Sequence, residues 1–125
     1  MFGNERIIKD WAEFVTGQYG DSQKVIAIEE MGELIQAVTK DMRGKADLQN
    51  LSEEIGDVVL TLAQLMILYS KEEPNFEKMV RLSMILKMRR TIERFLEEQN
   101  KEREEENNGG DVNGEGLRKI KRHTA

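Results

Sequence analysis

Apolar residues recur every three or four positions along most of the first hundred residues, which is the spacing of amphipathic helices. No stretch alternates apolar and polar residues at the two-residue period of a strand. The pattern predicts four helices, over about residues 4–17, 22–42, 48–70 and 75–98. Pro74 opens the fourth, because a proline is tolerated in the first turn of a helix. The sequence therefore predicts an all-α fold.

The same spacing predicts the inward face of the helices. In the second helix this face consists of Ile28, Met31, Ile35, Val38 and Met42. In the fourth helix it consists of Phe76, Val80, Met84, Met88, Ile92 and Phe95. The third helix is apolar on almost every side from Val58 to Tyr69, and such a helix is buried or lies at an interface. We therefore expect at least a dimer, which covers part of Leu60, Ala63 and Ile67.

The composition changes after residue 98, where charged residues and glycines replace almost all large apolar ones. We expect a single domain over residues 1–98, followed by a flexible charged tail over residues 99–125 that is mostly disordered from residue 101. Residues 101–125 hold six acidic and six basic residues, so the net charge of −5 belongs to the first hundred residues.

Composition also excludes several kinds of chemistry. The sequence has no cysteine, and its single histidine is His123, so disulfides, thiolate zinc sites and cysteine nucleophiles are ruled out. An acidic domain argues against nucleic acid as the main partner. The longest apolar stretch, from Val58 to Tyr69, is too short to span a bilayer, and the first residues contain no apolar run of signal-peptide length. We therefore expect a soluble protein of the cytoplasm.

Two short acidic clusters lie on the second and third predicted helices. Glu30 and Glu33 are three residues apart, as are Glu54 and Asp57, and this spacing puts both members of a pair on one helix face. Two such pairs on antiparallel helices would bring four carboxylates to one site. Oxygen ligands without histidine or cysteine favour a hard cation, with Mg²⁺ as the first choice and Mn²⁺ as the second.

The alternative is that these residues form ordinary solvated helix faces. A lone pair of glutamates is a weak indication of metal binding, because acidic residues on helices are common. The presence of two pairs, each followed by an apolar helix, makes a metal site the better interpretation. A di-iron bundle is disfavoured because its Glu-x-x-His pairs are missing from the first hundred residues.

The strings IEEMGELIQAVTK and LSEEIGDVVLTLAQL resemble the MazG-like family of all-α nucleoside triphosphate pyrophosphohydrolases, and the likeness covers about residues 8–95. The resemblance implies a four-helix bundle that is dimeric or tetrameric. It also implies Mg²⁺-dependent hydrolysis of a nucleoside or deoxynucleoside triphosphate to the monophosphate and pyrophosphate. Carried over position by position, it makes Glu30, Glu33, Glu54 and Asp57 the metal ligands and Glu29 the water-activating or supporting carboxylate.

A triphosphate also needs cationic partners. Lys87 and Arg90 share one face of the fourth predicted helix, and Lys40 lies near the end of the second, so we expect these three to bind phosphate groups. The alternative is that such bases pair with neighbouring glutamates on a solvated face. Two other functions remain open: a non-catalytic helical interaction module with a Mg²⁺-stabilised acidic site, and a hydrolase of a phosphoribosyl-nucleotide.

Overall fold

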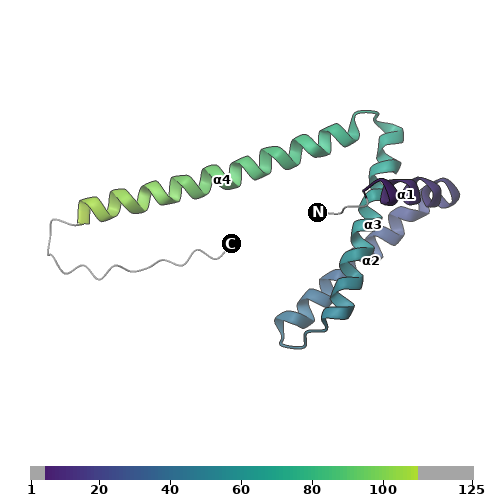
Figure 1. Ribbon diagram of the computed structural model, residues 1–125, viewed down its shortest axis with the longest axis horizontal. Coiled ribbons are helices and arrows are strands. Elements are labelled where there is room, and N and C mark those ends of the chain that lie inside the picture. Colours follow the sequence, from purple (N-terminus) through teal and green to yellow (C-terminus); the bar gives the residue numbers. More distant parts are fainter. Residues whose placement is uncertain (1–4, 110–125) are drawn as a thin grey trace. The chain divides into compact units, whose positions relative to one another are not determined.

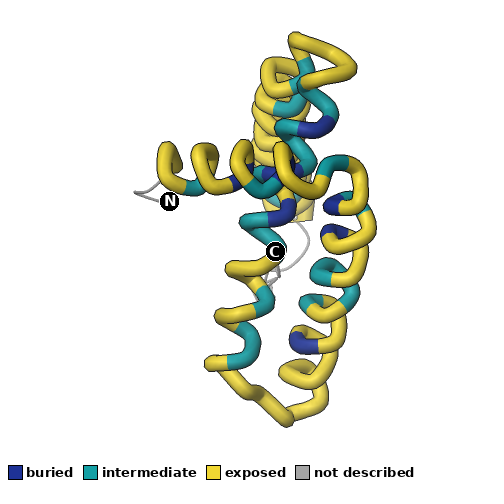
Figure 2. Tube along the Cα trace, turned by 90° about the vertical axis from the view of Figure 1, so that its right-hand side faces the viewer, coloured by how far each residue is buried: buried dark blue, intermediate teal, exposed yellow. Residues whose placement is uncertain are grey.

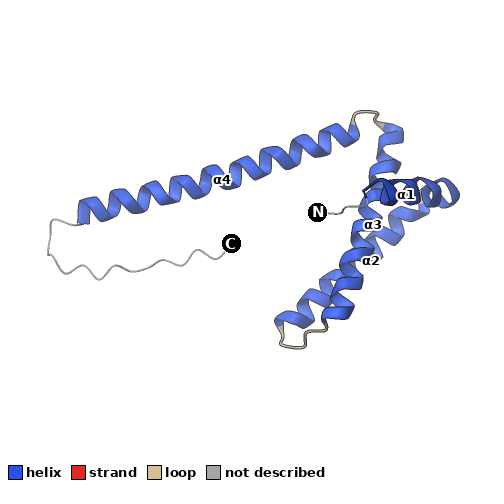
Figure 3. Ribbon diagram, in the orientation of Figure 1, coloured by secondary structure: helices blue, strands red, loops and turns tan. Residues whose placement is uncertain are grey.

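The computed structural model describes residues 5–109, and their regular structure is entirely helical (Figures 1 and 3). The helices are α1 (Glu5–Tyr19), α2 (Ser22–Met42), α3 (Leu48–Glu72) and α4 (Phe76–Gly109). The predicted all-α class and the order of its four helices are confirmed. None of the helices between residues 5 and 109 is long and apolar enough to cross a membrane.

The end predicted for the fourth helix was wrong, because α4 continues past residue 98 to Gly109. Residues 99–106 are mostly Glu, Lys, Arg and Gln, which favour helix even without a core to pack against. The helix ends where two glycines follow one another, Gly109 and Gly110. Residues 101–109 are therefore helical rather than disordered, and the rest of the predicted tail, residues 110–125, lies outside the described residues.

The chain divides into two compact units, residues 1–80 and residues 81–125. In the first unit α3 packs against both α2 and α1, and α1 also contacts α2. The second unit consists of α4 from Arg81 onward, together with residues outside the described range. The predicted boundary near residue 98 between domain and tail stays a prediction.

A tight hairpin turns the chain from α2 into α3. Gly44 adopts a φ of 77°, a left-handed conformation that glycine enters without strain, and its N–H donates to the carbonyl of Asp41 at 2.9 Å. Asp47 then caps α3, since its side chain accepts a hydrogen bond from the N–H of Asn50 at 3.1 Å. The short connection makes α2 and α3 antiparallel neighbours, as Figure 1 shows.

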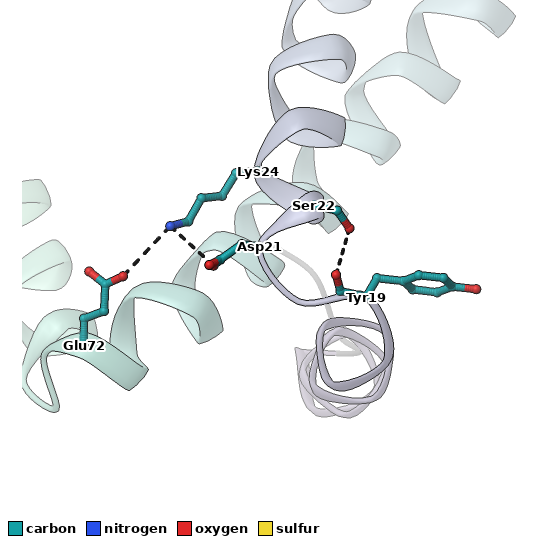
Figure 4. A network of polar contacts seen from close by, with 5 residues as sticks. All are labelled: Tyr19, Asp21, Ser22, Lys24 and Glu72. Atoms are coloured by element: carbon teal, nitrogen blue, oxygen red, sulfur yellow. Dashed lines mark hydrogen bonds and ion pairs between the residues drawn. The ribbon is translucent and has the colours of Figure 1, made fainter.

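The turn between α1 and α2 is shorter still, since only residues 20 and 21 separate the two helices. Gly20 has a φ of 59°, and its N–H donates to the carbonyl of Thr16 at 2.8 Å. The hydroxyl of Ser22 donates to the carbonyl of Tyr19 at 2.8 Å (Figure 4). These bonds fix the point where the chain leaves α1.

Lys24 joins the start of α2 to the end of α3. Its Nζ lies 3.5 Å from an oxygen of Asp21 and 3.9 Å from an oxygen of Glu72 (Figure 4). The same atom sits 4.7 Å from the ring centre of Tyr69, whose ring in turn contacts that of Phe76 at 5.4 Å between centres. Both acidic partners are exposed, so these ion pairs contribute little to stability, and the packing of the half-buried lysine stem against the rings is the more important part of this contact.

Most of the buried residues have small or polar side chains, with Leu68 as the exception. Figure 2 colours their positions dark blue. The buried residues are Ala12, Thr16, Gln23, Ala27, Ala37, Thr61, Gln64 and Leu68. All of them belong to α1, α2 or α3, and α4 has no buried residue.

The inward faces predicted for the second and fourth helices therefore do not form the core of this chain. In α2, Ile28, Ile35, Val38 and Met42 are exposed and Met31 is half-buried. The buried side of α2 carries Ala27 and Ala37 instead, because small side chains let two helices approach closely. In α4, Phe76 and Val80 are half-buried, and the other predicted residues, Met84, Met88, Ile92 and Phe95, are exposed.

Candidate metal centre

A buried hydrogen bond sets the alignment of α2 and α3. Nε2 of Gln64 donates to Oε1 of Gln23 at 2.9 Å, and both side chains are buried. Seven residues further along α2 lies Glu30, and seven residues back along antiparallel α3 lies Asp57. Seven residues are about two turns, or roughly 10 Å of helix. The glutamine pair therefore brings the two acidic clusters to the same level of the hairpin.

Glu30 lies on the side of α2 that faces α3. It follows Ala27 by three residues and precedes Ala37 by seven, and both alanines are buried at that interface. Glu54 is the matching residue on α3, and it is half-buried like Glu30. Two carboxylates are thus held partly away from water between packed helices, which is costly unless they are paired with a cation or protonated.

Three carboxylates meet at this point. Glu30, Glu33 and Glu54 each offer an oxygen that lies within 4.8 Å of the other two. Oε2 of Glu30 and Oε2 of Glu54 are both buried and have no hydrogen-bond partner. Buried polar atoms normally have a partner, so two such orphans in one cluster indicate that a cationic partner completes it.

The electrostatics agree with this geometry. Burial is the main cause that raises the pKa of the Glu30 carboxyl above its ordinary value of 4.5, followed by the negative charge of Glu33. Burial likewise leads the causes that raise the pKa of Glu54, again followed by the charge of Glu33 and then by a hydrogen bond with it. Crowded carboxylates hold their protons more tightly because ionising all of them puts like charges side by side.

Asp57 and Glu29 are not among the three carboxylates that converge. Asp57 is exposed and is not one of the three residues whose oxygens converge, but its charge contributes to the raised pKa of both Glu30 and Glu54. Glu29 is exposed on α2 beside Glu30. Of the five acidic residues singled out from the sequence, three therefore converge, one lies within electrostatic range, and Glu29 occupies the neighbouring position on the helix.

The basic residues expected to bind phosphate are exposed. Lys40 lies in the last turn of α2, seven residues and about 10 Å of helix beyond Glu33. Lys87 and Arg90 lie on α4 in the second unit. Their role in substrate binding stays a prediction.

Sequence reasoning missed the two glutamines that align the helices. Gln64 interrupts an otherwise apolar stretch of α3, and Gln23 lies four residues before the buried Ala27. Each glutamine occupies a core position of its helix, and this could have indicated that the two pair. A buried amide needs a hydrogen-bond partner, and another amide can supply one.

The donor set fits a hard divalent cation. All three converging groups are carboxylates, which are the ligands that Mg²⁺ and Mn²⁺ accept, and no histidine or cysteine lies among residues 5–109. Three protein carboxylates leave coordination positions for waters and substrate oxygens, which Mg²⁺ usually retains. The residues present therefore suit such an ion.

Comparison with known proteins identifies the family. A family model described as the MazG nucleotide pyrophosphohydrolase domain matches residues 18–95, which is more than half of the chain and includes both acidic clusters. Searches of curated proteins and of solved structures found no significant match. The resemblance noted in the sequence is thereby confirmed, and the chain belongs to the MazG nucleotide pyrophosphohydrolase domain family.

Proposed function

We propose that this protein hydrolyses a nucleoside or deoxynucleoside triphosphate to the monophosphate and pyrophosphate, with Mg²⁺ as cofactor and Mn²⁺ as a possible substitute. The observation that carries the proposal is the convergence of Glu30, Glu33 and Glu54, with two buried carboxylate oxygens that have no partner. Membership of the family supports the reaction class.

In this proposal Glu30, Glu33, Glu54 and Asp57 hold the cation. When bound, Mg²⁺ supplies charge neutralisation to the triphosphate and to the pyrophosphate that leaves. Asp57 is exposed and is not one of the three converging carboxylates, and in this scheme it is the fourth ligand.

Glu29 accepts the proton of the attacking water in this scheme. The water forms a bond to the α-phosphorus, the bond from that phosphorus to the bridging oxygen breaks, and pyrophosphate departs with the bonding electrons. Glu29 suits this role because it is exposed beside the cluster and is not one of the three converging carboxylates. No covalent intermediate with the protein is needed.

Lys40, Lys87 and Arg90 are the proposed phosphate ligands, and all three have exposed side chains that a nucleotide can reach. The proposed assembly is a homodimer or homotetramer that covers part of the half-buried Leu60, Ala63 and Ile67 on α3. The proposed location is the cytoplasm.

The test is incubation of the purified protein with a panel of nucleoside and deoxynucleoside triphosphates and one phosphoribosyl-nucleotide, with and without Mg²⁺. Monophosphate and pyrophosphate are the products to measure. We expect Mg²⁺-dependent release of both from at least one triphosphate, and loss of that release in Glu54→Gln, which keeps the side-chain shape but removes the charge.

Glu97→Gln serves as the control, because Glu97 is an exposed residue of α4. Its activity should equal that of the unmodified protein. Turnover of the phosphoribosyl-nucleotide alone would move the assignment to that second substrate class. Absence of turnover with the whole panel, together with stabilisation by Mg²⁺, would favour the non-catalytic interaction module.

A further inference from the structure

Asn50 lies on the same face of α3 as Glu54 and Asp57. It precedes Glu54 by four residues and Asp57 by seven, and both intervals return to one side of a helix. Its side chain is half-buried. Four residues are about 6 Å of helix, so Asn50 lies one turn from the acidic cluster, on the side toward the hairpin turn.

The side-chain amide of Asn50 has no hydrogen-bond partner among residues 5–109. The backbone N–H of this residue donates to Asp47 at 3.1 Å, which leaves the amide uninvolved. An asparagine amide offers two N–H donors. Oε2 of Glu54, one turn further along α3, is buried and also lacks a partner. A donor without an acceptor and an acceptor without a donor therefore lie on neighbouring turns of one helix face.

A neighbouring pair shows that this spacing permits a hydrogen bond. Nε2 of Gln49 donates to Oε1 of Glu53 at 3.0 Å, and these two residues are four positions apart, as are Asn50 and Glu54. An asparagine and a glutamate together have the same length as a glutamine and an aspartate, which form such bonds at this interval on isolated helices. The amide of Asn50 can therefore reach Glu54 by rotation of the two side chains alone.

No other neighbour of Glu54 on α3 can supply this hydrogen bond. The residues three or four positions away from it are Asn50, Leu51, Asp57 and Val58. Among these side chains only that of Asn50 carries an N–H group. The groups that converge on Glu54 from α2 are themselves carboxylates, from Glu30 and Glu33. Asn50 is therefore the neutral donor available to Glu54.

We propose that Asn50 is a positioning residue of the cation site, whose amide donates a hydrogen bond to the oxygen of Glu54 that does not face the cation. This inference rests on the proposed function, because it requires Glu54 to be a ligand. A carboxylate that binds a cation is ionised, and hydrogen bonds to ionised acceptors are shorter and about twice as strong as neutral ones. Such partners orient the ligating carboxylate, and their removal lowers metal affinity about 10–100-fold.

Cation binding by the full chain, measured without nucleotide, tests this role. The probe is Mn²⁺, whose free form is measured by electron paramagnetic resonance, and competition with Mg²⁺ gives the affinity for Mg²⁺. Asn50→Leu keeps the size of the side chain and removes the amide, so the dissociation constant for Mn²⁺ should rise about tenfold or more. Asn50→Gln keeps an amide that reaches a glutamate at this interval, as Gln49 does, so it should bind Mn²⁺ nearly as tightly as the unmodified protein.

Gln49→Leu is the matched control, because it removes an amide–carboxylate pair of the same kind from the exposed side of α3. Its affinity for Mn²⁺ should equal that of the unmodified protein. Thermal unfolding without metal separates positioning from stability. Asn50→Leu should not lower the metal-free melting temperature, because the amide that it removes has no partner within the described part of the chain.

A nuclear magnetic resonance measurement observes the hydrogen bond itself. The side-chain amide protons of Asn50 are assigned by the loss of their signals in Asn50→Leu. On addition of Mg²⁺ one of them should shift downfield, because its N–H then donates to an ionised carboxylate.

Three results would overturn the proposal. Equal affinity for Mn²⁺ in Asn50→Leu and in the unmodified protein would remove the positioning role and leave the cation site in place. An equal loss of affinity in Asn50→Gln and in Asn50→Leu would show that packing at position 50 matters rather than the amide. Absence of Mn²⁺ binding by the unmodified protein would remove this role together with the cation site. None of these measurements needs turnover, so cation binding with the expected pattern but without hydrolysis would contradict the proposed reaction alone.

Discussion

Glu33 connects the acidic groups of the two helices. It lies one turn after Glu30 on α2, and its charge and hydrogen bonds raise the pKa of both Glu30 and Glu54. The cluster is therefore a coupled group of acids in which protons or a cation relieve the same repulsion. As the pH rises, the stability of the metal-free protein should therefore fall, whereas its affinity for a cation should increase.

The metal-free protein should lose stability as the pH rises. Glu30 and Glu54 hold protons in the folded state at pH values where the unfolded chain has released them. Their contribution to the free energy of unfolding is thus fully present below pH 4.5 and is lost as the pH rises through the raised pKa values. Thermal unfolding without metal, followed from pH 4.5 upward, should show this fall, and Glu54→Gln should show less of it.

The quantity to compare is the difference in stability between the unmodified protein and Glu54→Gln at each pH, because all other titratable groups are common to both. Saturating Mg²⁺ should also reduce the fall, since the cation takes the place of the protons. If the unmodified protein and Glu54→Gln lost stability in parallel over the whole pH range, Glu54 would not be coupled to the cluster.

The chemistry of individual residues was the most predictable part of this protein. The spacing of Glu30 with Glu33 and of Glu54 with Asp57 indicated two carboxylate pairs, and three of these four residues converge. The spacing did not show that Asp57 would be the one outside the converging group. That depends on how α2 rotates against α3, which the buried alanines and glutamines decide.

The α2–α3 hairpin is the element that assembles the centre. Its alignment depends on the Gln23–Gln64 hydrogen bond, the short turn at Gly44 and the cap at Asp47. A buried amide that loses its partner retains the cost of its own desolvation. The glutamine pair is therefore a sensitive point for the stability of the hairpin.

Gln64→Leu should lower the free energy of unfolding by about 1–3 kcal/mol, because it leaves the buried amide of Gln23 without its partner. The double variant Gln23→Leu with Gln64→Leu should recover part of this loss, since no amide is then stranded. Urea denaturation of the four proteins gives the coupling energy. Additive losses in the double variant would mean that the bond does not couple the two helices.

The inward faces of the helices were harder to predict than the helices themselves. On α2 the helical spacing predicts an inward face of large residues such as Ile28 and Ile35, and both are exposed. Ala27 and Ala37 are buried because their small side chains let the helix backbones approach. Hydrophobicity alone does not distinguish a face that packs within the chain from a face that is available to another chain.

Few side chains are buried among residues 5–109, and those that are lie in α1, α2 and α3. Large apolar side chains remain exposed in both units, including Phe14 at 68% and Ile92 at 59%. Extended apolar surface of this kind is typical of protein–protein interfaces. Self-association should therefore be measured before the stability of this protein is interpreted.

Deleting residues 101–125 should change the stability and the hydrolysis little. Residues 101–109 continue α4 but contain no buried side chain, so their removal costs about 0.5 kcal/mol or less. The deletion also keeps the exposed large apolar residues of α4, the last of which is Leu96. A melting temperature far below that of the full chain would show that the folded domain extends beyond residue 100.

The central claim is that the carboxylates between α2 and α3 hold a divalent cation. Its most direct test is the effect of Mg²⁺ on thermal unfolding of the metal-free protein, in the unmodified chain, in Glu54→Gln and in Glu97→Gln. A cation that binds only the folded state at a hundred times its dissociation constant stabilises by about 2.7 kcal/mol. A cation site that includes Glu54 predicts this stabilisation in the unmodified chain and in Glu97→Gln, and its absence in Glu54→Gln. The metal-free stability of Glu54→Gln should be equal or higher, because one repulsive charge is gone. An equal response to Mg²⁺ in Glu54→Gln and in the unmodified chain would contradict this cation site.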